Sequence, residues 1–376
     1  MYRMMKRTAL ALCTLALSVA TASAEIKIGI AAPLTGIYAG LSGQIITGVK
    51  FAVDEINKSG GIKGELITIE TVDDKCEPEA AQGIANQFVG KGVIAVIGHL
   101  CDRPSIEASP VYSANKIVQL SPTSQNPAFT ENRPLSNGGT YRLAARNTQQ
   151  SEALTTFMVK HSTSKNIAIV NDGSVYGKGL ADAIIEGLKS EGITPVFSAN
   201  FESGEERYRR LSGRIVDSGA TLLFIGGVHL DAATLIRDID RLSDKITVIG
   251  GDGLVHTDFP KLVLEDNTNR DNLDNIFSSF PLDPRKLPSA KTAIERFKAG
   301  EQNPAGLALR GYSAMKILEA AISRATTSDF ESLNKVLNEQ SFQTPIGTIT
   351  FNDKGDADLV DYVIHQWRDN TIDAVN

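Results

Sequence analysis

From residue 26 onward the chain alternates short apolar runs with longer amphipathic segments, and this alternation constrains its fold more than any other feature. The runs at 26–32 and 66–72 are typical of buried strands, whereas Ile45, Val49 and Ile56 recur at helical spacing. Further strands are predicted at 93–97, 117–120, 166–170, 194–197, 221–225 and 246–249, and further helices at 78–90 and 179–191. Strands that alternate with helices form right-handed βαβ units, so the sequence predicts an α/β protein with parallel sheets.

Beyond about residue 277 the alternation weakens. Helical spacing predicts helices at 307–325 and 332–340. The run at 346–351, the turn residues at 352–355 and the run at 362–367 predict a pair of adjacent antiparallel strands. A stretch rich in Asn, Pro and Gly at 131–139 predicts a loop near the boundary between two βαβ blocks.

The first 24 residues have the order of parts typical of a secretory signal peptide. Arg3, Lys6 and Arg7 precede an apolar run at 9–20, and Ala22-Ser23-Ala24 supplies small residues for cleavage. The apolar run is too short to span a bilayer as a membrane anchor. The sequence therefore predicts export and cleavage after Ala24.

The chain of 376 residues, even without this leader, exceeds the size at which one core stops growing, so two domains are expected. Its formal net charge is −6, and loss of the leader removes only basic groups. An acidic chain is a poor partner for nucleic acid or an anionic membrane surface, and neither is expected.

Two cysteines, Cys76 and Cys101, remain after the leader. In an oxidising compartment an even pair is most simply one disulfide. It would tie the loop after one strand to the loop after the next. A catalytic thiol is the alternative interpretation.

Two neighbouring strands run into polar loops, at 98–105 and at 121–127. Ligands of parallel α/β sheets bind at the carboxyl ends of strands, where backbone groups and helix N-termini are free. These loops therefore predict a site for a small ligand. The sequence contains no G-x-G-x-x-G after a strand, Walker A motif or G-x-S-x-G elbow, and its five histidines lack metal-ligand spacing. No cofactor, metal or catalysis is expected.

Nine segments in order resemble the branched-chain amino acid binding proteins of ABC importers, which have the type I periplasmic-binding-protein fold. The segments are GGIKG at 60–64, DDKCEP at 73–78, VIGHLC at 96–101, LSP at 120–122, NP at 126–127, YGKG at 176–179, GG at 226–227, NDKGD at 352–356 and QW at 366–367. The resemblance covers essentially the whole chain after the leader. It implies a periplasmic monomer that works with a membrane permease, and a structural disulfide that matches Cys76 and Cys101.

The resemblance also implies two lobes with flanked parallel sheets, joined by three hinge crossovers and closing on a ligand. Lobe one is expected at 25–143 and 277–350, and lobe two at 144–276 and 351–376. In this family the lobes hold an amino acid zwitterion. Tyr176 matches a lobe-two tyrosine, Asp252 stands where the family has an ammonium-binding glutamate, and Ser124 matches a position whose backbone contacts the ligand.

Other positions depart from the family pattern. Asp102 stands where the family has a carboxylate-binding serine, and Gln125 replaces a ligand-binding threonine. Val228 replaces a tyrosine, and Leu41 falls near a tryptophan of some members. A desolvated Asp beside a ligand carboxylate is repulsive, so either Asp102 turns away, pairing with Arg103, or the ligand is unusual. Arg103 could clamp a carboxylate instead.

Each site residue has a structural interpretation as well. Asp102 and Arg103 could form a solvated helix start, Tyr176 could pack at a loop tip, and Asp252 could serve a turn. The sequence predicts a solute-binding protein for a neutral, branched-chain or related amino acid. The alternatives are a protein of the same fold that binds a different small carboxylate or amide, a sensor that reports ligand to a receptor, and a secreted α/β enzyme.

Overall fold

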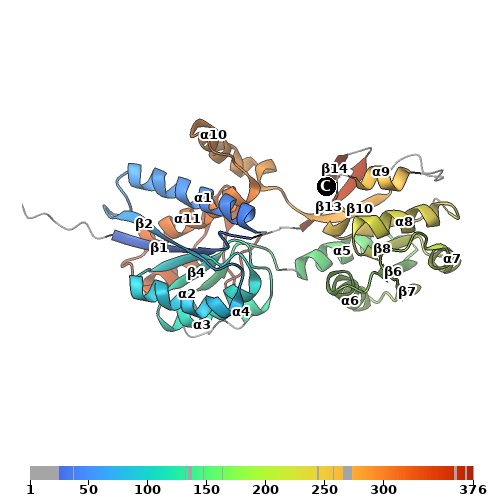
Figure 1. The fold of residues 1–376 in the computed structure, drawn as a ribbon, viewed down its shortest axis with the longest axis horizontal. Coiled ribbons are helices and arrows are strands. Elements are labelled where there is room, and N and C mark those ends of the chain that lie inside the picture. The colour runs from blue at the N-terminus through green and yellow to red at the C-terminus, as the bar shows by residue number, and fades with distance from the viewer. Residues whose placement is uncertain are drawn as a thin grey trace, which may run out of the picture.

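The protein is described here by a computed structural model, in which two bodies lie side by side along the longest axis (Figure 1). The structure describes residues 25–375 except 37, 132, 134–137, 147, 163, 244, 257, 266–272, 360–361 and 369–370. The predicted signal peptide and much of the predicted loop at 131–139 lie outside the described residues. Among the described helices, none combines the length and apolar character needed to cross a membrane.

The first body is built on a parallel sheet with the strand order β2-β1-β3-β4-β5. Its strands are β1 (Glu25–Ala32), β2 (Leu66–Asp73), β3 (Ala95–Gly98), β4 (Val118–Ser121) and β5 (Thr140–Arg142). Ile28 and Ile30 face a core shared with α1 (Ala39–Lys58) and α11 (Gly306–Arg324). Ala31 and Val96 face α2 (Pro78–Lys91) and α3 (Asp102–Ala114) on the other side. Both faces of this sheet are therefore covered, as its continuous apolar strands require.

The remaining elements of this body complete its edges. They are α4 (Ala128–Glu131), the 3-10 turns η2 (Pro284–Lys286) and η3 (Pro288–Ala290), α10 (Lys291–Ala299), α12 (Phe330–Glu339), β11 (Phe342–Thr344) and β12 (Gly347–Ile349). Residues of α10, α12 and β11 belong to the same core as β1 and α11. This body, with the strands β1–β5, is called lobe one below.

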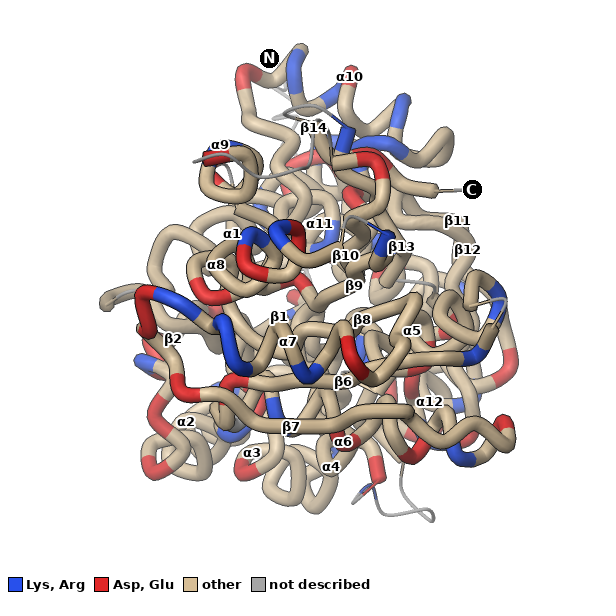
Figure 2. Tube along the Cα trace, turned by 90° about the vertical axis from the view of Figure 1, so that its right-hand side faces the viewer, with Lys and Arg blue, Asp and Glu red and all other residues tan. Residues whose placement is uncertain are grey.

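The second body, lobe two, is built on a mixed sheet with the order β14-β13-β10-β9-β8-β6-β7. Its strands are β6 (Ile167–Asn171), β7 (Phe197–Asn200), β8 (Leu222–Gly226), β9 (Thr247–Gly250), β10 (Ile276–Pro281), β13 (Tyr362–Arg368) and β14 (Thr371–Ala374). One face packs on α5 (Thr148–His161) and α6 (Val175–Ser190), the other on α7 (Arg209–Asp217), α8 (His229–Asp240) and α9 (Phe259–Leu264). The 3-10 turn η1 (Asp252–Leu254) follows β9. Figure 2 faces this lobe and shows acidic and basic residues mixed along the chain.

The chain passes between the two lobes three times: after β5, after β10 and after β12. The first crossover leaves the carboxyl end of β5 and the second leaves the carboxyl end of β10, so both sheets turn these ends toward the crossovers. The predicted α/β class and the two-lobed arrangement are confirmed. The boundary predicted at 277 falls inside β10, which pairs with β9, so the second crossing lies beyond Pro281.

The predicted strand pair at 346–351 and 362–367 is wrong. β12 pairs with β11, whereas β13 lies in the other lobe between β10 and β14. The predicted turn does form, because the Gly355 amide donates to the Asn352 carbonyl at 2.8 Å. It reverses the chain only locally, at a single bridge between Phe351 and Ala357, and the chain then crosses to lobe two.

Two predicted elements of lobe two begin elsewhere. The helix predicted from 179 begins at Val175, since the Ser174 hydroxyl accepts a hydrogen bond from the Gly177 amide at 2.9 Å and caps it. The strand predicted at 194–197 is β7, which begins at Phe197. The earlier start of α6 places Tyr176 in the first helical turn rather than in a loop.

Candidate functional site

The six predicted ligand-binding residues fall into two groups, one in each lobe, and all follow the carboxyl ends of strands. Asp102 and Arg103 begin α3, which follows β3, and Ser124 and Gln125 follow β4. In lobe two, Tyr176 lies in α6 after β6, and Asp252 begins η1 after β9. No hydrogen bond or ion pair between described residues joins Asp102, Arg103 or Ser124 to Tyr176 or Asp252.

In lobe one, Asp102 holds the loop after β4 through backbone amides. Its Oδ1 accepts hydrogen bonds from the amides of Gln125 at 2.7 Å and Asn126 at 3.1 Å. Asp102 also lies in the first turn of α3, where a negative charge complements the helix N-terminus. The carboxylate therefore turns toward the loop. The suggested pairing with Arg103 does not occur: Arg103 is exposed and forms no hydrogen bond or ion pair with another described residue.

Ser124 belongs to a buried group of hydroxyls beneath the same loop. Its Oγ lies 2.5 Å from the Ser105 Oγ and 2.9 Å from the Ser121 Oγ, and its side chain is fully buried. The Ser124 amide donates to the Ser121 Oγ at 3.0 Å. Ser124 is consequently closed off from the surface, both in its side chain and in its backbone.

Gln125 reaches from lobe one to lobe two. Its side chain is half-buried, and its Nε2 lies 3.5 Å from the Tyr362 Oη on β13, the upper limit of a hydrogen bond. A residue selected from the sequence as a ligand contact thus also lies beside the opposite sheet.

In lobe two, Tyr176 and Asp252 lie in direct contact. The Tyr176 hydroxyl donates a short hydrogen bond to the Asp252 Oδ1. Burial and the adjacent carboxylate of Asp252 raise the pKa of Tyr176 above its usual value, so the phenol stays protonated and acts as the donor. Tyr176 is 38% exposed and Asp252 is half-buried, so both remain accessible from the strand end.

Two further members of this cluster, Gln150 and Ser279, were not predicted from the sequence, which carries no pattern that marks them. The Gln150 Nε2 on α5 donates to the Asp252 Oδ1 at 3.0 Å and lies 3.1 Å from the Ser279 Oγ on β10. Gln150 is 102 positions from Asp252 in the chain and 129 positions from Ser279. Only the tertiary arrangement of α5, β9 and β10 brings these side chains together.

Glycines make the close approach of these elements possible. A Cβ on Gly177 would lie 2.6 Å from the Gly226 carbonyl oxygen, so the first turn of α6 rests directly on the end of β8. A Cβ on Gly251 would lie 2.1 Å from the Tyr176 Oη. Gly251 thus leaves the space that the tyrosine hydroxyl occupies beside Asp252.

Cys76 and Cys101 form the predicted disulfide, with their Cα atoms 5.5 Å apart. It joins the loop after β2 to the residue that precedes Asp102. Beside it the fully buried His99 lies between Asp74, 2.6 Å from its Nδ1, and the Tyr112 hydroxyl, 3.2 Å from its Nε2. This side of the site is therefore fixed covalently and by buried polar contacts.

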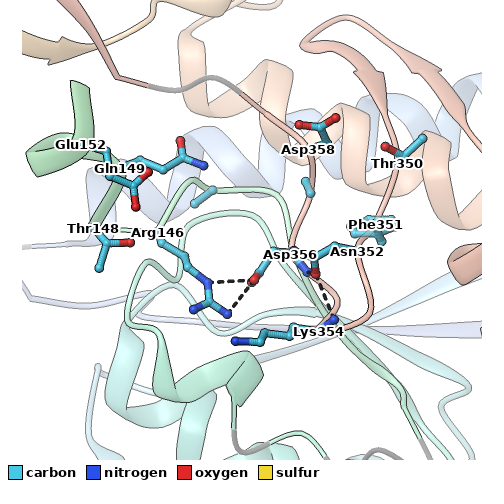
Figure 3. A pocket seen from close by; sticks show the side chains of 12 residues that line it. Arg146, Thr148, Gln149, Glu152, Thr350, Phe351, Asn352, Lys354, Asp356 and Asp358 are labelled. Atoms are coloured by element: carbon cyan, nitrogen blue, oxygen red, sulfur yellow. Dashed lines mark hydrogen bonds and ion pairs between the residues drawn. The ribbon is translucent and has the colours of Figure 1, made fainter. Parts of the chain in front are cut away.

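A pocket of about 510 Å³ is lined by residues of the first and third crossovers and the start of α5 (Figure 3). Arg146, Glu152, Lys354 and Asp356 are among its lining residues. Arg146 and Asp356 point toward each other and are ion-paired at 2.7 Å. A second pocket, of about 420 Å³, lies between α5 and α6 and includes Gln150 and Tyr176. The first pocket is thus lined by charged groups of the crossovers, including Asp358, whereas the second pocket includes two members of the cluster around Asp252.

The departures from the family pattern are accessible in both lobes. Leu41 in the first turn of α1 and Val228 before α8 are each 43% exposed. Within the described part of the chain, no group of three or more His, Cys, Asp or Glu side chains is placed to hold a metal ion.

Comparison with known proteins agrees with this architecture. The family model described as periplasmic binding protein matches residues 25–371. An amino acid binding protein of Pseudomonas aeruginosa is 33% identical over 349 residues, covering 93% of this chain and 91% of that protein. The Leu/Ile/Val-binding protein homolog 3 of Brucella melitensis is 33% identical over 353 residues, covering 93% and 94%.

Among solved structures, an ABC transporter substrate-binding protein of Desulfitobacterium hafniense in complex with Leu superposes with a TM-score of 0.72. It is 23% identical in sequence, and the match covers 94% of this chain and all of that one. This likeness supports the fold of both lobes. The chain belongs to the periplasmic binding protein family, and the branched-chain amino acid binding proteins are its relatives within it.

Proposed function

We propose that this protein binds a neutral amino acid, with leucine, isoleucine and valine as the first candidates, between its two lobes. It delivers that ligand to the permease of an ABC importer and catalyses no reaction. The leader is cleaved after Ala24, and the mature chain works as a monomer in the periplasm. The relatives named as Leu/Ile/Val-binding proteins support the ligand class.

The observation that carries this proposal is the carboxylate of Asp252 at the strand end of lobe two. Tyr176 and Gln150 donate to its Oδ1, so the carboxylate is held in one orientation. A fixed carboxylate in a partly desolvated site attracts an ammonium group. In lobe one the N-terminus of α3, which no side chain caps, offers backbone donors to the other end of a zwitterion.

Closure follows from how the ligand is shared between the lobes. A ligand that touches both lobes binds the closed arrangement more tightly than the separated one, and so shifts the population toward closure. The three crossovers are the segments about which the lobes move. The closed form then presents both lobes together to the permease.

Thermal unfolding of ligand-stripped mature protein tests the proposal across amino acids, amides and small carboxylates. A ligand at about 1,000 times its Kd stabilises the native state by roughly 4 kcal/mol. Stabilisation by leucine, isoleucine or valine supports the proposed ligand class. Stabilisation by another amide or carboxylate instead would assign the site to that ligand, and recovery of chemically altered ligand would refute the absence of catalysis.

A further inference from the structure

The loop after β4 is held on both sides by charged side chains. The Asp102 carboxylate accepts from its amides at Gln125 and Asn126, as described above. On the other side Arg142, the last residue of β5, donates from Nη1 to the Asn126 carbonyl at 2.9 Å and to the Ser124 carbonyl at 3.3 Å. A cation on its carbonyls and an anion on its amides fix the path of this loop.

Arg142 is in turn fixed by a residue of the third crossover. Its side chain is fully buried, and its Nε donates to the Asp356 Oδ1 at 2.6 Å. The Thr130 hydroxyl donates to the same oxygen at 2.7 Å. The Arg146 Nε of the first crossover donates to the other oxygen, Oδ2, at 2.8 Å, an approach visible in Figure 3. A single carboxylate therefore joins two crossovers and the cation that holds the ligand-site loop.

Backbone hydrogen bonds also join the end of β5 to the third crossover. The Arg142 amide donates to the Gly355 carbonyl at 3.0 Å, and the Ala357 amide donates to the Arg142 carbonyl at 3.1 Å. Gly355 has a φ of 85°, and a Cβ there would lie 2.1 Å from the Thr140 carbonyl oxygen. The third crossover thus lies against the edge of the lobe-one sheet, directly behind the loop.

We propose that Arg142 and Asp356 are positioning residues for ligand binding, which set the conformation of the Ser124–Asn126 loop from the crossovers. The inference rests on the proposed function, since it assigns this loop to the ligand site. It goes beyond that function by making ligand affinity depend on a carboxylate in the third crossover.

The charges explain why Asp356 is the sensitive member. Burial raises the pKa of Asp356, but the hydrogen bond from Thr130, the charge of Arg142 and the hydrogen bonds from Arg146 and Arg142 outweigh burial and hold its pKa below the ordinary value. Removing the carboxylate leaves the buried Arg142 guanidinium without its counter-charge, which is strongly unfavourable. Arg142 then leaves its position, and the carbonyls of Ser124 and Asn126 lose their donor.

The test compares Asp356→Asn with Asp238→Asn in the full mature chain. Asp238 is a matched control, because it is also buried and ion-paired, with Arg241 at 2.6 Å, but lies on α8 in lobe two. Two quantities are measured well below the unfolding temperature of each variant. One is hydrogen exchange in peptides that cover Ser124–Asn126, and the other is the Kd for leucine by calorimetry.

We expect exchange of these amides to become about five- to tenfold faster in Asp356→Asn, as for the loss of one hydrogen bond, and to stay unchanged in Asp238→Asn. The leucine Kd should rise about 2- to 30-fold in Asp356→Asn only. Folded Asp356→Asn with unchanged exchange, or with faster exchange and an unchanged Kd, overturns the inference. If wild-type protein binds no leucine, the proposed ligand fails, while the exchange data still decide whether Asp356 holds the loop.

A second variant keeps the test decisive if Asp356→Asn does not fold. Thr130→Val removes the hydroxyl that donates to Asp356 and accepts from Arg142 and Arg146, and it keeps every charge of the cluster. It should raise loop exchange and Kd in the same direction by a smaller factor. No change of either quantity in this folded variant contradicts the inference.

Discussion

The two halves of the ligand site are built in opposite ways. In lobe one the candidate residues Asp102 and Ser124 form hydrogen bonds within the lobe itself. Asp102 accepts from two loop amides, and Ser124 lies within a group of buried hydroxyls. In lobe two a partly exposed carboxylate, Asp252, is oriented by the neighbouring side chains of Tyr176 and Gln150. Lobe one therefore contributes a rigid backbone surface, and lobe two contributes a charged side chain.

This difference separates stability from affinity. Changes in lobe one remove contacts that the ligand-free protein already makes, so we expect them to lower the free energy of unfolding. Changes at Asp252 remove a negative charge whose counter-charge arrives only with the ligand, so we expect them mainly to weaken binding. The predictions below test that separation.

Asp252→Ala should have the largest effect on affinity. Loss of one partner of a buried charge pair costs about 2–5 kcal/mol, which should appear in the Kd for the ligand measured by calorimetry. The free energy of unfolding without ligand should fall by less, about 1 kcal/mol, because Tyr176 is partly exposed and the Gln150 amide keeps Ser279 as a partner.

The matched control is Asp258→Ala, which removes an exposed carboxylate of the same lobe, 3.8 Å from His256. It should leave both quantities unchanged. Unaltered affinity in Asp252→Ala would contradict an ammonium-binding role for this residue.

Replacement of both Cys76 and Cys101 by Ser should lower stability by roughly 3 kcal/mol, through greater freedom of the unfolded chain. The two cysteines are 25 residues apart and both lie in lobe one, where Cys101 directly precedes Asp102, so the lost stability belongs to lobe one. Urea unfolding measures the change, and the Kd of the folded protein should move little. Detection of two free thiols in the natively exported protein would contradict the disulfide.

Ser124→Ala should lower the free energy of unfolding by about 1–3 kcal/mol, because buried hydroxyls of Ser105 and Ser121 lose a partner. Ser113→Ala is the control, since the Ser113 hydroxyl is buried without a hydrogen-bond partner among the described residues. Its removal should be neutral or stabilising. Equal destabilisation in both variants would show that the serine group of lobe one contributes nothing specific.

The sequence predicted the fold well where a local pattern carried the information. Continuous apolar runs become the parallel strands of both sheets, because each strand is covered on two faces. The strand pair predicted at 346–351 and 362–367 was wrong, since turn residues at 352–355 specify a reversal but not the sheet that the next strand joins. That choice depends on β10, which lies far away in the chain.

The site was predictable only as far as single residues could be recognised. Tyr176 and Asp252 were selected from the resemblance, and the structure brings them together. Gln150 and Ser279 were missed, because a polar residue in a helix or strand carries no signal of what another element brings to it. Arg142 and Asp356, 214 positions apart, were missed for the same reason.

Substitution of Asp102 should have the smallest effect and gives the finest test of the difference between the lobes. In Asp102→Asn the side-chain oxygen can still accept from the amides of Gln125 and Asn126, so stability and Kd should each change by less than about 1 kcal/mol. Asp102→Ser shortens the side chain and leaves those amides unpaired, so its loss should exceed that of Asn and appear in stability first. If Asp102→Asn instead changes affinity strongly while stability holds, the charge of Asp102 meets the ligand directly. Lobe one would then contribute a charged side chain as lobe two does, and the contrast between the two halves would fail.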